Sequence, residues 1–237
     1  TEEEAKRIAA ACEKKQAVVS SLKRETKTVN PPKLYDLTTL QREANRYYGF
    51  TAQQTLDLVQ TLYEEKLLTY PRTDSQFITD DMEDTARQVI SIVCRQLPLF
   101  SDVSVTPDIA RVTNNSKVTD HHAILPTVQL EKQDVSALPQ SEQKILNLIG
   151  MRLLCATGEK HTYAETQITL SCESYTFKTK GKTVVQNGWK AIEELFKASL
   201  KTKEKDDPMK SLPEVHEGDV LDGVSASVTE HFTTPPK

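Results

Sequence analysis

The segment Tyr70-Pro71-Arg72-Thr73-Asp74-Ser75 places a phenol, a permanent cation, a carboxylate and two hydroxyls close together. Pro71 stops any helix and favours extended geometry at Tyr70. Side chains two positions apart on an extended chain point the same way, so Tyr70 and Arg72 are expected to reach the same small anion. A guanidinium matches phosphate oxygens and can lower the phenol pKa from its usual value of about 10. The segment is therefore compatible with a tyrosine nucleophile for a phosphate ester. The alternative is a half-buried tyrosine beside a surface Arg-Asp pair.

A second polar segment, Thr119-Asp120-His121-His122, follows the turn-forming residues Asn114-Asn115-Ser116. Adjacent histidines point opposite ways on an extended chain, so they are not expected to share one metal ion. An ordinary polar loop, or a hydrogen-bonded histidine pair, is the alternative to a functional role.

Other candidate metal or redox sites are not supported by spacing. The four cysteines are scattered and read as reduced thiols, without a disulfide framework or a zinc site. They are Cys12, Cys94, Cys155 and Cys172. The acidic run between Asp80 and Asp84 is interpreted as charge at a helix N-terminus.

The composition favours a soluble globular chain of one large or two small domains, with 237 residues, 37% hydrophobic and 27% charged. A net charge of −4 argues against gripping duplex DNA by bulk charge. A local groove for a single strand remains compatible with it. Neither a membrane-spanning run nor a signal peptide is apparent, so we expect no membrane partner and a cytoplasmic location. The family resemblance described below adds an expected association with the nucleoid.

The middle of the chain is predicted to be helical. Helices are expected at 39–48, ending at Gly49, at 52–66, from Thr79 to Leu97, and from Ser141 to Cys155. Thr38 with Gln41, and Thr51 with Gln54, have capping-box spacing. Two short helices followed by a strand at 67–70 suggest a winged-helix or helix-turn-helix arrangement that presents Tyr70 from a rigid element.

Both ends of the chain are predicted to be β-rich. Strands are expected at 17–28, 164–173 and 220–228, with a hairpin turn at 179–182. Trp189 is interpreted as a core anchor, with DNA stacking as the alternative, and 197–210 as a lysine-rich connection. The predicted fold class is α+β. A discontinuous β-rich domain (1–33 and 157–237) carries an inserted, mainly helical, winged-helix-like domain (34–156) that holds the tyrosine.

Residues 62–75 resemble the active-site signature of type IA DNA topoisomerases. The proline directly after the tyrosine, Pro71, makes this signature similar to that of the DNA topoisomerase III branch. The resemblance runs through most of the chain, is strong at 37–75 and 118–127, and includes the final Thr-Pro-Pro-Lys at 234–237. It implies that the β-rich domain is the family's arch. It also implies that Tyr70 attacks a phosphodiester of single-stranded DNA to form a 5′-phosphotyrosyl bond. Arg72 would contact the scissile phosphate. His121 would bind the same phosphate or relay protons, and Asp74 would hold the His121 side chain.

The same resemblance gives roles to neighbouring side chains and partners. Thr73 and Ser75 would contact DNA with Arg72 and His121, while Asp74, Asp120 and His122 would support the site. The family's magnesium-binding Asp-x-Asp-x-Glu pattern is not found here, so Mg²⁺ is expected to be held outside this chain, and no metal by the chain itself. The expected partners are single-stranded DNA and N-terminal and C-terminal parts of a longer parent, without which the chain is expected to be inactive.

The implied function is ATP-independent cleavage and rejoining of single-stranded DNA in a bacterium, which allows strand passage during relaxation or decatenation. Two alternatives stay open on the residues alone. One is a non-catalytic winged-helix module that binds nucleic acid. The other is a tyrosine recombinase, which would need several Arg and His residues around one phosphate.

Overall fold

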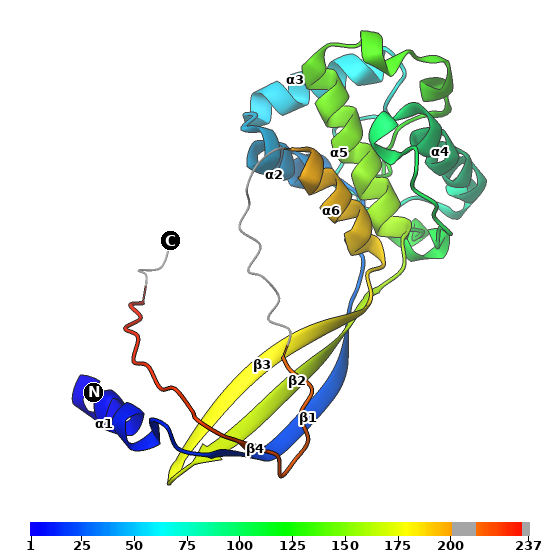
Figure 1. The fold of residues 1–237 in the computed structure, drawn as a ribbon. Coiled ribbons are helices and arrows are strands. Elements are labelled where there is room, and N and C mark those ends of the chain that lie inside the picture. The colour runs from blue at the N-terminus through cyan, green and yellow to red at the C-terminus, as the bar shows by residue number, and fades with distance from the viewer. Residues whose placement is uncertain (201–211, 234–237) are drawn as a thin grey trace. The chain divides into compact units, whose positions relative to one another are not determined.

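The computed structural model describes residues 1–200 and 212–233. It divides into a sheet unit (Thr1–Lys27, Tyr163–Val185, Lys205–Lys237) and a helical unit (Thr28–Thr162, Gln186–Glu204). Figure 1 shows the elements of each unit. Helices and sheet occur together, as the predicted α+β class requires. Residues 201–210 of the predicted connection and the Thr-Pro-Pro-Lys end lie outside the described residues.

The helical unit contains five α-helices among its described residues, together with short 3₁₀ turns: α2 Leu37–Tyr48, α3 Ala52–Glu64, α4 Glu83–Gln96, α5 Gln140–Thr157 and α6 Trp189–Ser199. The turns are η1 Asp80–Met82, η2 Pro98–Phe100, η3 Ile109–Arg111, η4 Asn115–Lys117, η5 Val128–Lys132 and η6 Val135–Ala137. Helix α5 packs against α2, α3, α4 and α6 (Figure 1). It is buried along most of its length, as its nearly continuous apolar sequence predicts.

The caps of α2 and α3 show how the sequence sets their ends. Thr51 and Gln54 form the predicted capping box of α3. Gly49 ends α2 in the left-handed conformation, at a φ of 71°. The prediction for the start of α2 is wrong, because Asp36 rather than Thr38 is the N-cap. Its carboxylate accepts a hydrogen bond from the Thr39 amide at 2.6 Å.

The sheet unit contains α1 (Glu2–Cys12) and most of a four-stranded sheet in the order β3-β2-β1-β4. The strands are β1 Ala17–Val29, β2 His161–Cys172, β3 Tyr175–Gln186 and β4 Val220–Leu221. The first two predicted strands are confirmed. The last prediction is too long, because only Val220 and Leu221 pair, antiparallel to Val18 and Ala17.

Two predictions about the region after β2 are wrong. The hairpin turn lies at Glu173–Ser174, and residues 179–182 continue through β3. Residues 186–200 group with the helical unit, as do 28–33 and 157–162, whereas the sequence prediction assigned them to the β-rich domain. The reason is helix α6, whose Ile192 and Phe196 are buried against the helical core. Gly188 allows the sharp entry into α6, since a Cβ there would lie 2.3 Å from the Lys160 carbonyl oxygen.

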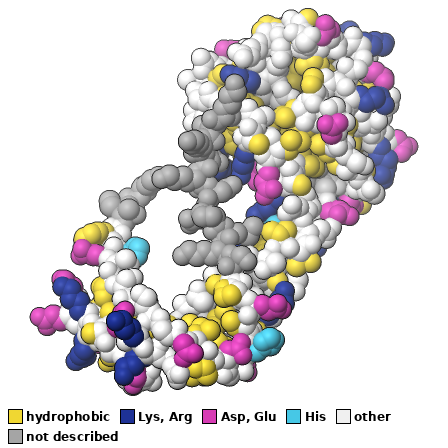
Figure 2. Space-filling view, viewed as in Figure 1, with side chains coloured by type: hydrophobic (Ala, Val, Ile, Leu, Met, Phe, Trp, Pro, Cys, Tyr) yellow, Lys and Arg dark blue, Asp and Glu magenta, His cyan; other side chains and the backbone are white. Residues whose placement is uncertain are grey.

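Each unit has its own core. The helical unit holds the large one, built from buried aliphatic side chains of α2 to α6 and the intervening loops. The core of the sheet unit is small, with Cys12, Ala17 and Cys172 as its buried members. Figure 2 shows apolar side chains on the visible face of this unit, and its exposed ones include Phe177, Val220, Leu221 and Val228. No helix within residues 1–200 and 212–233 is long and apolar enough to cross a membrane.

Candidate active site

The segment that carries Tyr70 begins at the end of helix α3. Leu67 donates its amide to the Leu62 carbonyl at 2.8 Å, and Lys66 donates to the Tyr63 carbonyl at 2.8 Å. This pair of bonds is the Schellman pattern of a helix C-terminus. Lys66 occupies the position where glycine is usual, with a φ of 63°. The motif turns the chain sharply and buries Leu67 and Leu68 directly before the site.

Main-chain bonds then fix the segment after α3 to the segment after His122. Leu68 forms a single antiparallel bridge with Pro126, so the strand predicted at 67–70 reduces to this bridge. The Thr69 amide donates to the Leu125 carbonyl at 2.9 Å. The Thr69 hydroxyl accepts from the Leu125 amide at 2.9 Å and donates to the Ala123 carbonyl at 3.2 Å. The two motifs singled out in the sequence therefore lie side by side.

Beyond Tyr70, burial alternates along the chain. Pro71, Thr73 and Ser75 are buried, whereas Arg72 and Asp74 are exposed. This is the pattern of an extended chain with one face against the protein. The structure thus presents the guanidinium and the carboxylate to solvent and turns the two hydroxyls inward.

The inward hydroxyls hold the histidine loop. Thr73 Oγ1 donates to the His121 carbonyl at 3.0 Å and accepts from the Ser75 amide at 3.1 Å. Ser75 Oγ donates to the Lys117 carbonyl at 2.8 Å. With 8% and 4% of their surfaces exposed, Thr73 and Ser75 have little surface to offer DNA. Their observed contacts position the site, and the predicted contacts with DNA stay predictions.

Arg72 and His121 line one pocket of about 510 Å³. Its wall comes from three parts of the chain: Asp36, Leu37 and Thr38 at the start of α2; Arg72, Thr73 and Asp74; and Thr119, Asp120 and His121. The start of α2 is fixed there because the Leu37 amide donates to the Thr73 carbonyl at 3.1 Å. A cation and an imidazole that face one cavity provide a place for a phosphate group.

Tyr70 packs directly against His121. Their ring centroids are 4.2 Å apart with planes inclined by 39°, and the ring of Tyr63 in α3 meets the Tyr70 ring edge-on, with centroids 5.5 Å apart. Tyr70 is half-buried, so its hydroxyl is not sealed inside the core. No hydrogen bond of that hydroxyl, and no ion pair of Arg72, occurs within the described part of the chain. The surface Arg-Asp pair of the alternative interpretation is therefore not formed.

The predicted supporting residues differ in their placement. Asp74 and Asp120 line the pocket with His121, but no hydrogen bond joins Asp74 to His121 within 1–200 and 212–233. His122 does not line this pocket, and its Nδ1 lies 2.8 Å from the Ala123 carbonyl oxygen. The two histidines thus have separate environments, as their adjacency predicts.

The pocket does not fit a resident metal ion. Three aspartates border it, yet the Asp36 carboxylate caps α2 and accepts from Gln76 Nε2 at 3.0 Å. Among all described residues, no group of three or more His, Cys, Asp or Glu side chains is arranged to hold a metal.

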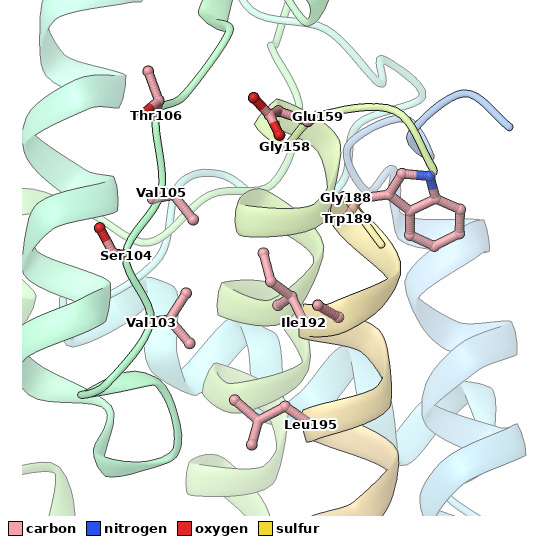
Figure 3. A pocket seen from close by; sticks show the side chains of 11 residues that line it. Val103, Ser104, Val105, Thr106, Gly158, Glu159, Gly188, Trp189, Ile192 and Leu195 are labelled. Atoms are coloured by element: carbon pink, nitrogen blue, oxygen red, sulfur yellow. The ribbon is translucent and has the colours of Figure 1, made fainter. Parts of the chain in front are cut away.

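A second pocket, of about 560 Å³, lies between residues 103–106 and helix α6 (Figure 3). Ile192 and Leu195 face Val103 and Val105 across it, and Ser104, Thr106 and Glu159 add polar groups to its lining. The Trp189 ring turns away from residues 103–106, and its Nε1 donates to the Val29 carbonyl at 3.2 Å. This contact matches the predicted role of Trp189 as an anchor.

Sequence reasoning missed Thr69 and Tyr63 as parts of the site. Thr69 precedes the phenol and joins both motifs through one hydroxyl, while Tyr63 is the penultimate residue of α3. Spacing along α3 places Tyr63 near the C-terminal end of the helix. Its edge-on contact with Tyr70, however, depends on the Schellman turn, and that turn is hard to predict because Lys66 replaces the usual glycine.

Comparisons with known proteins show which family this chain belongs to. The DNA topoisomerase family profile matches residues 1–237. DNA topoisomerase 3 of Bacillus licheniformis is 36% identical over 241 residues, covering 97% of this chain and 32% of the relative. DNA topoisomerase 3 of Bacillus subtilis is 37% identical over 228 residues, covering 94% and 31%. The chain therefore spans about a third of the length of these relatives.

A solved structure, full-length topoisomerase I from Thermotoga maritima, shares the fold with a TM-score of 0.66 at 24% identity. The match covers 94% of this chain and 35% of that one. Since the family profile matches the chain from end to end and the curated relatives carry the same family name, the chain belongs to the DNA topoisomerase family, as the type IA signature around Tyr70 predicts.

Proposed function

We propose that this chain carries the nucleophile of a type IA DNA topoisomerase that cleaves and rejoins single-stranded DNA. The observation that supports the proposal most is the contact of the half-exposed Tyr70 ring with His121, at the edge of a pocket that Arg72 also lines. Family membership supplies the class of reaction. The residues supply a cation and an imidazole that line one pocket, and a phenol whose ring packs against that imidazole.

In the proposed step, the Tyr70 oxygen attacks the phosphorus of a phosphodiester. A phosphorus–oxygen bond to tyrosine forms as the bond to the 3′ oxygen breaks, which leaves a 5′-phosphotyrosyl end and a 3′ hydroxyl. Arg72 binds the phosphate oxygens and stabilises the charge that develops on them. His121 moves the proton from the phenol toward the leaving 3′ oxygen. The reverse step rejoins the strand without ATP, because the ester bond energy is retained in the tyrosine link.

The Mg²⁺ of the family is proposed to come with regions of the parent protein outside this chain. When bound, it would help to position and neutralise the phosphate. The described side chains do not form a metal site of their own, so the steps assigned here use only Tyr70, Arg72 and His121. Strand passage, and the choice between relaxation and decatenation, are proposed for the full-length protein.

The test is Tyr70→Phe in the full-length protein that contains this chain. The change keeps the ring contacts with His121 and Tyr63 and removes the attacking oxygen, so covalent capture of a labelled single strand should be lost. Tyr63→Phe is the matched control, since it removes a phenol oxygen from the neighbouring ring and should leave capture intact. Continued capture by the Tyr70→Phe protein would refute the nucleophile assignment. Binding of the labelled strand by the unmodified protein without any covalent product would favour a non-catalytic binding module.

A further inference from the structure

Two cysteines meet where helix α1 reaches the tip of the β2–β3 hairpin. Cys12 is the last residue of α1, and Cys172 is the last residue of β2, directly before the turn at Glu173–Ser174. Cys12 Sγ lies 3.8 Å from the Cys172 carbonyl oxygen, and Cys172 Sγ lies 4.0 Å from the Cys12 carbonyl oxygen. Each thiol therefore contacts the backbone carbonyl group of the other cysteine.

Further contacts fix the same junction. Lys15, three residues after Cys12, pairs at 3.8 Å with Glu173, which directly follows Cys172. The Lys14 amide donates to the Val224 carbonyl at 2.7 Å, which joins the end of α1 to the C-terminal segment. The backbone around the thiols is thus held in place before any covalent bond forms between them.

The thiols are buried but lie in a shallow core. Cys12 is 0% and Cys172 1% exposed, and Ala17 is the third buried member of their cluster. A cluster of this size opens locally far more readily than the core of the helical unit. Burial raises the pKa of the Cys12 thiol, so exchange proceeds through such openings.

The other two cysteines offer a contrast within the same chain. Cys155 is buried in the helical unit, where its Sγ contacts Met151 Sδ and the Trp189 carbonyl oxygen, each at 3.5 Å. Cys94 is half-buried on α4. Neither has a cysteine partner among the described residues.

We propose that Cys12 and Cys172 form a thiol–disulfide exchange site that takes low-molecular-weight disulfides such as oxidised glutathione. One cysteine thiolate attacks the small disulfide, forms a mixed disulfide and releases one glutathione thiolate. The second cysteine thiolate attacks the mixed disulfide, forms the Cys12–Cys172 bond and releases the second glutathione. The two protons of the cysteines pass to the two glutathione thiolates. The product joins α1 covalently to the hairpin tip.

The experiment treats the 237-residue chain with oxidised glutathione, blocks remaining thiols with iodoacetamide and measures intact mass and peptide maps. We expect a product lighter than the reduced chain by two hydrogen atoms before blocking. One peptide pair should be linked through Cys12 and Cys172, and Cys94 and Cys155 should be alkylated. Dithiothreitol should reverse the link. Cleavage of α1 by trypsin after Lys6 and Arg7 should slow about tenfold in the oxidised chain, because local opening is restricted.

Matched variants decide the assignment. Cys94→Ser should form the internal bond as the unmodified chain does. Cys12→Ser and Cys172→Ala should each stop at a mixed disulfide on the remaining cysteine, and using two different substitutions separates this result from misfolding of one variant. The proposal is overturned if the unmodified chain accumulates only mixed disulfides, or if the linked pair includes Cys94 or Cys155. The outcome does not depend on whether Tyr70 captures DNA.

Discussion

The Arg72 side chain is exposed and forms no ion pair within residues 1–200 and 212–233, so its guanidinium is available to a ligand. Its neighbours Pro71 and Thr73 are buried, so its exposed side chain projects from a fixed main chain toward the pocket. A guanidinium so placed can offer both arms of its fork to a phosphate.

Arg72→Ala should therefore lower covalent capture of single-stranded DNA by about 10²-fold, the scale for removing one donor that stabilises developing charge. Arg72→Lys should recover only part of the loss, because a point charge replaces a planar fork. Single-turnover capture in the full-length protein measures both effects. Equal activity of the Lys variant and the unmodified protein would show that charge alone suffices at this position.

Thr73 gives a stability prediction at the same scale. Thr73→Val keeps the shape but removes a hydroxyl that joins the His121 carbonyl to the Ser75 amide. The unfolding free energy should fall by about 1–2 kcal/mol, since two inward-facing backbone groups lose their partner. Thr38→Val, at an exposed position of the same pocket, should change it by less than about 0.5 kcal/mol. Chemical denaturation checks both values, and similar losses for the two variants would contradict the positioning role.

At the scale of elements, the turn after α3 determines where Tyr70 emerges. Lys66 adopts a left-handed conformation that costs an L-residue about 1–2 kcal/mol. The side chain is exposed, and the bonds that define the motif come from the main chain. The strain can therefore be relieved without disturbing the site.

Lys66→Gly should raise the unfolding free energy by about 0.5 kcal/mol, because relief of strain exceeds the extra backbone entropy of glycine in the unfolded chain. Lys66→Ala should give no such gain, since alanine keeps the Cβ that causes the strain. Thermal unfolding of the three proteins makes the comparison. A stabilisation by Ala as large as that by Gly would mean that the lysine side chain, rather than φ, is the source of the effect.

Some elements of the fold could be predicted from the sequence and others could not. The long amphipathic and apolar runs predicted α3, α4 and α5, and the alternation from Ala164 to Cys172 predicted β2, because each pattern is local. The true hairpin turn was missed, since Glu173–Ser174 lacks a glycine and the Thr-Lys-Gly-Lys sequence further on carries the stronger turn signal. Helix α6 was missed because its burial depends on packing against α5.

The same holds for the candidate site, of which only some features could be predicted from the sequence. Tyr70, Arg72 and His121 were predicted from their types and the resemblance of their motifs. The inward direction of Thr73 and Ser75 was not, because it depends on hydrogen bonds to a loop more than 40 residues away in sequence.

At the scale of the whole molecule, buried phenols link stability to alkaline pH. Burial raises the pKa of Tyr35, which lies within the helical core and donates to Glu43, and also the pKa of Tyr48. The folded state therefore holds both protons more tightly than the unfolded chain. This contribution is fully present below about pH 10, the unfolded pKa, and is lost as pH rises through the folded values.

The unfolding midpoint should accordingly decline as pH rises beyond about 10. Tyr48→Phe should make the decline shallower, because one of the two groups no longer ionises in the unfolded chain. Tyr63→Phe, at an exposed position, serves as the control with an unchanged slope. Denaturant titrations across this pH range provide the measurement, and identical slopes for all three proteins would exclude the linkage.

The hydrogen bonds that unite the two motifs have a practical consequence for engineering. They come from main-chain atoms and from Thr69, Thr73 and Ser75, whereas Arg72, Asp74, Asp120 and His121 contribute no side-chain bond to the union within the described residues. The side chains at these four candidate positions are thus separable from the hydrogen bonds that join the two motifs. Substitutions at these four positions could therefore introduce new functional groups while the hydrogen bonds between the two motifs stay in place.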